Sequence, residues 1–273
     1  MASGVEQPLE RNKVAPVPWL RVRAELPPRV RRWVGWGFIA LLLLAWAAVT
    51  AAKLVLPAFL PSPVSVARAA AEVAGKGDLL PAVLITLKRI WHALLLVVAI
   101  GVPLGVLMGS FALFDSLLSP VVAGVKAVPT TAFIALVIVW FGIGERAKVV
   151  FLFLGAIFFM LLLVRDAILG VREEHVRTAL DLGAGSARTV FSVLLPAAMP
   201  QIWDGIIVCN GIMWTYVLLA EFINAQSGLG YLINTASRMQ RPDRVFAGII
   251  LIAVISVCTD WVLRRVKARW FAY

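Results

Sequence analysis

Hydrophobic and polar residues follow one another along this chain in long blocks. Six apolar runs lie at 36–56, 84–109, 119–141, 147–169, 200–223 and 245–264. About 20 helical residues cross the hydrocarbon core of a bilayer, and in that core only helices or closed barrels satisfy every backbone group. The pattern therefore predicts an all-α polytopic membrane protein with six transmembrane helices.

Basic residues gather at both ends of this pattern. Those before the first apolar run and after the last are Arg11, Lys13, Arg21, Arg23, Arg29, Arg31, Arg32, Arg264, Arg265, Lys267 and Arg269. Positive charge marks the cytoplasmic flanks of spans, and an even number of spans places both termini on one side. We therefore expect both termini in the cytoplasm. The expected parts are a basic leader over 1–35, a six-helix transmembrane domain over 36–265 and a tail over 266–273.

Alternation of the six spans assigns a side to each connecting segment. The segments 57–83, 142–146 and 224–244 are expected outside, and 110–118 and 170–199 in the cytoplasm. The stretch that follows the first span contains Ser62 and Pro63, which are suited to the N-cap and the first turn of a helix. A short helix outside the membrane is therefore predicted over 60–75.

Composition, charge and motifs argue against several classes of protein. Hydrophobic residues make up 61% of the chain and charged residues 15%, which is more apolar than a soluble domain needs. A net charge of +11 would suggest nucleic-acid binding in a soluble protein, but here the charge flanks the membrane spans, so no nucleic-acid partner is expected. Cys209 and Cys258 lie inside apolar runs and His92 lies far from His175, so neither a disulfide framework nor a metal site is predicted. No catalytic motif appears, so an enzyme is not expected.

Small residues recur along the second apolar run. Gly101, Gly105 and Gly109 are four residues apart, with Pro103 between them. This spacing places three glycines on one helix face, where the backbone of a neighbouring helix can approach closely. Packing within the chain is the favoured interpretation, and a dimer contact is the alternative.

The cytoplasmic segment between the fourth and fifth spans is charged and contains glycine. Glu173, Arg177 and Asp181 are spaced four apart, which is typical of a helix. Val176, Ala179, Leu180 and Gly183 fall along one flank and would form a shallow surface there. The residues alone leave two alternatives open, a docking surface and a solvated connector between two spans.

This segment resembles the coupling loop of ABC importer permeases, whose signature reads E-A-A-x-x-x-G-x9-I-x-L-P. The sequence matches at Ala179, Gly183, Val193, Leu195 and Pro196, and has Arg177 and Thr178 in place of the glutamate and the first alanine. Further stretches at 60–66, 100–109, 136–145, 218–233 and 245–252 resemble the aliphatic sulfonate, nitrate and taurine branch of these permeases.

The resemblance implies a type I ABC importer permease fold, in which a cytoplasmic coupling helix docks on an ATPase subunit. The residues that it assigns to the coupling loop over 172–196 are Arg177, Thr178, Ala179, Leu180, Gly183, Ala184, Leu195 and Pro196. The implied partners are two ATPase subunits, a second permease copy in a homodimer, an external solute-binding protein and the lipid of a bacterial inner membrane. ATP and Mg²⁺ would be held by the ATPase subunits, because this chain has no G-x-x-x-x-G-K-[ST] loop and no cofactor of its own is expected.

Polar residues inside the spans are candidates for the translocation pathway, because they are costly in lipid. The third span holds Lys126, Pro129, Thr130 and Thr131, and Pro129 is expected to interrupt the helix beside Lys126. This region lines the central pathway in the resembling family. The fifth span holds Asn210, Trp214 and Glu221. Lys126 could instead snorkel to the membrane boundary. Glu221 could pair with an outer arginine or help to hold an external gate.

The function that we expect is import of a small anion, such as a sulfonate, nitrate, taurine or bicarbonate, by alternating access. An ABC permease for a vitamin precursor is one alternative. A self-contained secondary transporter or channel is another, but it would need a central carboxylate site and internal repeats, and the sequence has neither.

Overall fold

The structure is a computed structural model that describes residues 26–75, 77–223 and 226–271. Most of the predicted leader, with Arg11, Lys13, Arg21 and Arg23, and the last two residues of the predicted tail lie outside the described residues. The chain divides into two compact units between Val55 and Leu56, each considered by itself below.

The first unit contains one described helix, α1, over Pro28–Ala51. Proline stands in its first turn, where the missing N–H costs no hydrogen bond. The hydroxyl of Thr50 donates to the carbonyls of Trp46 and Ala47, so this polar side chain needs no other partner. The helix is long and apolar enough to span a membrane and begins eight residues before the predicted run.

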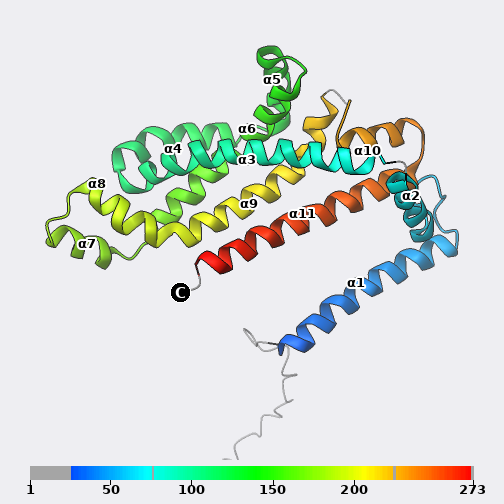
Figure 1. Cartoon of the computed structure of the whole chain (residues 1–273), viewed down its shortest axis with the longest axis horizontal. Helices are drawn as coiled ribbons and strands as arrows, with labels where there is room; N and C mark the ends of the chain where they lie inside the picture. The colour runs from blue at the N-terminus through cyan, green and yellow to red at the C-terminus, as the bar shows by residue number, and fades with distance from the viewer. Residues whose placement is uncertain (1–25, 76, 224–225, 272–273) are drawn as a thin grey trace, which may run out of the picture. The chain divides into compact units, whose positions relative to one another are not determined.

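The second unit is built around three long helices, with no strand among its described residues. These are α3 over Leu79–Ser110, α6 over Glu145–Leu169 and α9 over Leu195–Phe222. The buried side chains of all three form one apolar core, and α6 packs between the other two. The last helix, α11 over Pro242–Trp270, packs along α9 (Figure 1).

The glycines of α3 explain how closely it packs on α6. A Cβ atom built on Gly105 would lie 2.6 Å from the Cβ of Val164, and one built on Gly109 would lie 2.6 Å from the Cβ of Ile168. At Gly101 the nearest atoms, 3.0 Å away, belong to the flexible side chains of Ile157 and Met160. The predicted packing of this glycine face within the chain is therefore confirmed.

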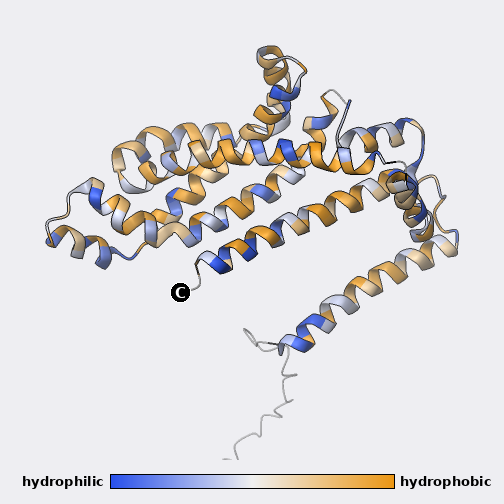
Figure 2. Cartoon of the chain, viewed as in Figure 1, coloured by the Kyte–Doolittle hydropathy of each residue, from blue (hydrophilic) through white to orange (hydrophobic). Residues whose placement is uncertain are grey.

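The helices confirm the predicted all-α membrane architecture. Among the described residues, five helices are long and apolar enough to cross a membrane, and a bent helix pair raises the number to six if it counts as one span. Figure 2 shows apolar residues along most of α3, α6, α9 and α11, and hydrophilic residues at the C-terminal end of α11. The side of the membrane on which each end lies stays a prediction.

The third span, predicted over 119–141, is interrupted at Pro129 as expected, and it consists of two separate helices. The helix α4 over Ala112–Lys126 ends before Pro129, a short 3₁₀ turn η2 covers Thr130–Ala132, and α5 covers Phe133–Phe141. The axes of the two halves differ by 84°. Pro129 has no N–H to continue the helix and disfavours helical geometry at Val128, which explains the break.

Short helices lie at the two ends of the second unit. At one end, α7 over Glu173–Asp181 and α8 over Ser186–Thr189 form the predicted loop. At the other end, α2 over Pro63–Gly75 and α10 over Leu229–Arg238 pack against α11 (Figure 1). The N–H of Ser65 donates to Oγ of Ser62 at 3.2 Å, so the predicted cap of α2 is confirmed. The segments predicted to lie outside therefore meet at the end opposite to the loop.

Candidate functional site

The coupling segment folds as a short helix that ends at a left-handed glycine. Gly183 has φ +81°, a backbone conformation that costs other residues energy. Its N–H donates to the carbonyl of Leu180 at 2.9 Å, and the N–H of Ala184 donates to the carbonyl of Ala179 at 3.0 Å. This pair of bonds is a Schellman motif, which stops α7 at a defined residue. No heavy atom lies within 4 Å of a Cβ built on Gly183.

The segment rejoins the fifth span through a widened turn. Residues 186–222 form one continuous helical stretch, and its π-helical turn η3 covers Val190–Leu194. The N–H of Leu195 reaches the carbonyl of Val190, five residues back, and Pro196 follows with no N–H to donate. The predicted residues Leu195 and Pro196 therefore lie where the π turn returns to an α-helix, a feature that is frequent at functional sites.

The exposed surface of α7 differs in part from the flank that the sequence suggested. Val176 and Ala179 are half-buried, whereas Leu180 and Leu182 are 50% and 83% exposed. Thr178 is exposed, and its hydroxyl donates to the carbonyl of Glu174 at 2.7 Å. Two apolar side chains thus remain exposed at the C-terminal end of a charged helix.

Arg177 bonds within its own helix. Its guanidinium donates twice to Oε1 of Glu173, at 2.7 and 3.0 Å, and both side chains are exposed. Within the described residues it makes no ion pair with Asp181. An exposed pair of this kind stabilises a helix by only about 0.3 to 0.5 kcal/mol.

The bend of the third span borders a cavity of about 200 Å³. Lys126, Pro129 and Thr130 line it, and Nζ of Lys126 lies 5.7 Å from the ring centroid of Phe159. Thr131 is exposed on the same turn. The structure therefore places three of the four predicted residues of this span around one small cavity, and Thr131 lies beside them.

Tyr216 of α9 and Gly155 of α6, which are not among the predicted pathway residues, also line this cavity. The hydroxyl of Thr130 donates to that of Tyr216 at 3.3 Å. A Cβ built on Gly155 would lie 2.9 Å from the Tyr216 ring, so the absence of a side chain lets α9 and the bend approach α6. The position of Gly155 inside an apolar run was the one available sequence signal.

The candidate residues of the fifth span lie in other surroundings. Asn210 and Trp214 are buried, and both donate to the hydroxyl of Thr259 on α11, at 3.3 and 2.9 Å. They join two helices and do not line the cavity at the bend. Glu221 lies at the C-terminal end of α9, in the ion cluster described next.

A buried ion cluster ties α3, α6 and α9 together at the end of the unit that carries α10. Arg89 is 2% exposed and Glu221 is fully buried, and Nη1 of Arg89 lies 2.7 Å from Oε1 of Glu221. Nε and Nη2 of the same guanidinium donate to Glu145 at 2.6 and 2.5 Å. The backbone carbonyl and the hydroxyl of Ser227 accept the remaining donors at 3.0 and 2.8 Å. All five N–H donors of Arg89 are therefore used.

The carboxylates of the cluster are also compensated by other donors. Thr86 donates to Glu221 at 2.6 Å, and the N–H of Gly230 donates to it at 2.5 Å. Lys148 donates to Glu145 at 3.1 Å. The predicted pairing of Glu221 with an arginine is thus confirmed, and the partner is Arg89, near the start of the predicted second span.

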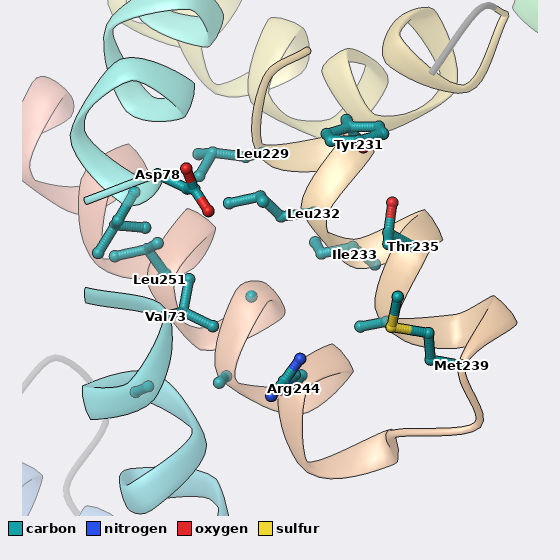
Figure 3. Close-up of a pocket in the computed structure, with 15 residues that line it drawn as sticks. Val73, Asp78, Leu229, Tyr231, Leu232, Ile233, Thr235, Met239, Arg244 and Leu251 are labelled. Carbon is teal, nitrogen blue, oxygen red and sulfur yellow. The ribbon is translucent and has the colours of Figure 1, made fainter. Parts of the chain in front are cut away.

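A separate cavity of about 280 Å³ lies between α2, α10 and α11. Figure 3 shows Leu232 and Ile233 of α10 and Leu251 of α11 among its apolar walls, with Asp78 and Arg244 at its border. Arg244 pairs with Glu72 at 3.0 Å. Among the described residues, no group of three or more His, Cys, Asp or Glu is placed to hold a metal ion.

Comparison with known proteins shows where the chain is similar to others. Residues 101–271 match the family described as binding-protein-dependent transport system inner membrane component. The taurine transport system permease protein TauC of Escherichia coli strain K12 is 32% identical over 238 residues, which cover 85% of this chain and 86% of that protein. The putative aliphatic sulfonates transport permease protein SsuC of Bacillus subtilis strain 168 is 30% identical over 243 residues, which cover 88% of each.

A solved structure shares the fold. An inward-facing native crystal form of the MetNI methionine ABC transporter aligns with a TM-score of 0.60 and 23% identity, covering 71% of this chain and 98% of that one. At this identity the likeness concerns the arrangement of helices only.

Proposed function

The chain belongs to the family of binding-protein-dependent transport system inner membrane components, and from this membership we propose that it imports a small anion by alternating access. The chain is an inner-membrane permease subunit of an ABC importer and does not belong to an enzyme family. The proposed solutes are taurine and alkanesulfonates, because the relatives with these names are similar over nearly the whole chain. Nitrate and bicarbonate are further members of the proposed anion class.

The observation that carries the proposal is the coupling segment. Its helix α7 ends at a defined glycine, presents Leu180 and Leu182 to solvent and continues through a π turn into α9. A rigid connection of this kind would transmit movement of a docked ATPase to the span. The proposed coupling residues are those at 177–180, 183–184 and 195–196.

The partners belong to the same proposal. Two ATPase subunits would bind ATP and Mg²⁺, and a second copy of this chain would complete the pathway. An external solute-binding protein would deliver the solute to the end of the unit that carries α2 and α10. Both termini would then lie in the cytoplasm.

The proposed pathway passes the bend of the third span. Lys126, Pro129, Thr130 and Thr131 would contact the solute there, because a cation beside a small cavity attracts anions more strongly than a cation in water. Asn210, Trp214 and Glu221 would support the walls through Thr259 and Arg89. A secondary transporter is the other class, and it would need no ATPase.

ATP-driven uptake tests the proposed function. The chain is reconstituted in liposomes with its ATPase and solute-binding protein, and uptake of labelled taurine, butanesulfonate and nitrate is measured with and without ATP. We expect uptake of at least one anion only when ATP and both partners are present. Uptake by the chain alone, driven by an ion gradient, would overturn the ABC permease proposal.

Substitution of Gly183 tests the coupling role. Gly183→Val puts a β-branched residue in the left-handed region, which costs about 1 to 2 kcal/mol and shifts the end of α7. We expect less ATPase to copurify and uptake to fall. Gly183→Asn is the matched control, because asparagine tolerates this conformation and the added side chain meets open space. Full association and uptake with Gly183→Val would remove the coupling role.

A further inference from the structure

The largest cavity beside the ion cluster lies between the N-terminal halves of α3 and α6. Its volume is about 900 Å³. Most of its walls are apolar and come from Ile85, Leu95, Leu96, Phe141, Val149 and Val150. On α3 its lining residues include Lys88, Leu95 and Leu96, which are exposed, whereas Gly101 and Gly105 of the same helix are buried.

Unpaired positive charge borders this cavity. Lys88 and Arg146 both line it, both are exposed, and neither makes an ion pair within the described part of the chain. The nearby carboxylate of Glu145 is already shared by Arg89 and Lys148. Arg89 also lines the cavity, but all five of its donors are occupied. Lys88 and Arg146 are therefore the cations that remain available to a ligand.

Lys88 lies within α3, a helix that is long and apolar enough to span a membrane. It precedes His92 by one turn, and Nδ1 of His92 lies 2.7 Å from the Lys88 carbonyl and must donate to it. Ionisable residues in spans usually face a water-filled cavity or a partner, because lipid solvates them poorly. An open cavity next to two cations supplies the first of these environments.

We propose that this cavity is a binding site for a small amphipathic anion of the alkanesulfonate class. Lys88 and Arg146 attract the sulfonate, and the apolar wall of Leu95, Leu96 and Val149 receives the carbon chain. An inorganic oxyanion such as sulfate has no apolar part to contact that wall. The site should therefore bind an anion with a carbon chain more tightly than an inorganic oxyanion. The inference rests on the proposed function in one respect, that the transported solute is an anion.

Cysteine labelling tests the charge of the cavity. His92→Cys is introduced in a chain with Cys209→Ala and Cys258→Ser and purified in complex with its partners. The labelling rates of two methanethiosulfonate reagents are compared, one with an ethylsulfonate group and one with an ethyltrimethylammonium group. We expect the sulfonate reagent to be favoured relative to its reaction with free cysteine. Adding Lys88→Gln and Arg146→Gln should lower that preference about tenfold, because each charge acts with opposite sign on the two reagents.

The matched control removes the same charge elsewhere. Arg68→Gln and Arg238→Gln neutralise two exposed cations outside the cavity and should leave the preference unchanged. Butanesulfonate should slow labelling of His92→Cys at lower concentration than sulfate does. An unreactive cysteine, an unchanged preference after removal of Lys88 and Arg146, or equal protection by sulfate would overturn the site.

The labelling and the uptake assay separate the two proposals. ATP-driven anion uptake combined with an unchanged labelling preference would reject the cavity site and leave the function in place. A charge-dependent preference without ATP-driven uptake would reject the function and leave the anion-attracting cavity in place.

Discussion

Replacement of Arg89 by methionine is expected to destabilise the protein more than any other single side-chain change at its ion pairs. The change leaves Glu221, which is fully buried, without its guanidinium partner. Removal of one member of a buried pair typically costs about 3 to 5 kcal/mol. Thr86 and the N–H of Gly230 still donate to Glu221, but neither carries charge. Thermal unfolding of the purified chain should shift down by on the order of 10 °C.

Two further variants show that the effect comes from the uncompensated charge. Arg89→Met combined with Glu221→Met should recover much of the lost stability, because no buried charge then remains unpaired and Glu145 is largely exposed. Lys267→Met breaks the pair with Asp204, which is partly exposed, and should cost no more than about 1 kcal/mol. Equal shifts for Arg89→Met and Lys267→Met would contradict the structural role of the cluster.

The sequence could indicate that Glu221 needs a partner but could not identify Arg89. An ionisable group at the end of a span needs compensation, and this general rule predicted an outer arginine. The two residues are 132 positions apart. Arg89 lies near the start of the predicted second span, and five other arginines lie in the segments predicted to be outside: Arg68, Arg146, Arg238, Arg241 and Arg244. The choice depends on how α3 packs beside α9, which a pattern of hydropathy does not specify.

The interruption of the third span at Pro129 was predicted, but the size of the bend was not. The residues on both sides of Val128 and Pro129 are apolar, so the hydropathy pattern predicts one span of suitable length over 119–141. A proline does not by itself predict a sharp bend, because Pro103 and Pro200 lie inside the continuous helices α3 and α9. What differs is the tertiary setting, since the bend at Thr130 contacts Tyr216 beside Gly155.

A local signal predicted the start of α2 correctly, because Ser62 caps it as expected. Gly183 was expected on one flank of the loop helix, but it lies after the end of α7, in the left-handed conformation of a C-terminal cap. Such local signals do not indicate a binding partner. The resemblance at 179–196 does, because it implies that the exposed helix α7 docks on an ATPase subunit. Its coupling residues and those of the pathway stay predictions until the variants described above are measured.

The glycine face of α3 gives the second large expected effect. Gly105→Ala should destabilise the chain by about 1 to 3 kcal/mol, because its Cβ would lie 2.6 Å from the Cβ of Val164 and 3.0 Å from the carbonyl oxygen of Leu161. Neither atom can rotate away, so α3 and α6 must separate. Gly101→Ala should cost clearly less, because the nearest atoms belong to the movable ends of Ile157 and Met160.

A third glycine separates this steric effect from helix propensity. Gly124 lies in α4 with no heavy atom within 4 Å of an added Cβ, so Gly124→Ala should stabilise the chain by up to about 1 kcal/mol. Thermal unfolding of the three variants should therefore rank Gly124→Ala above the unchanged chain, Gly101→Ala slightly below it and Gly105→Ala well below. If Gly101→Ala and Gly105→Ala unfolded at the same temperature, close backbone contact at Val164 would not be what holds α3 against α6. If the ranking is observed, the four-residue glycine spacing acts within the chain, by bringing the backbones of α3 and α6 into close contact.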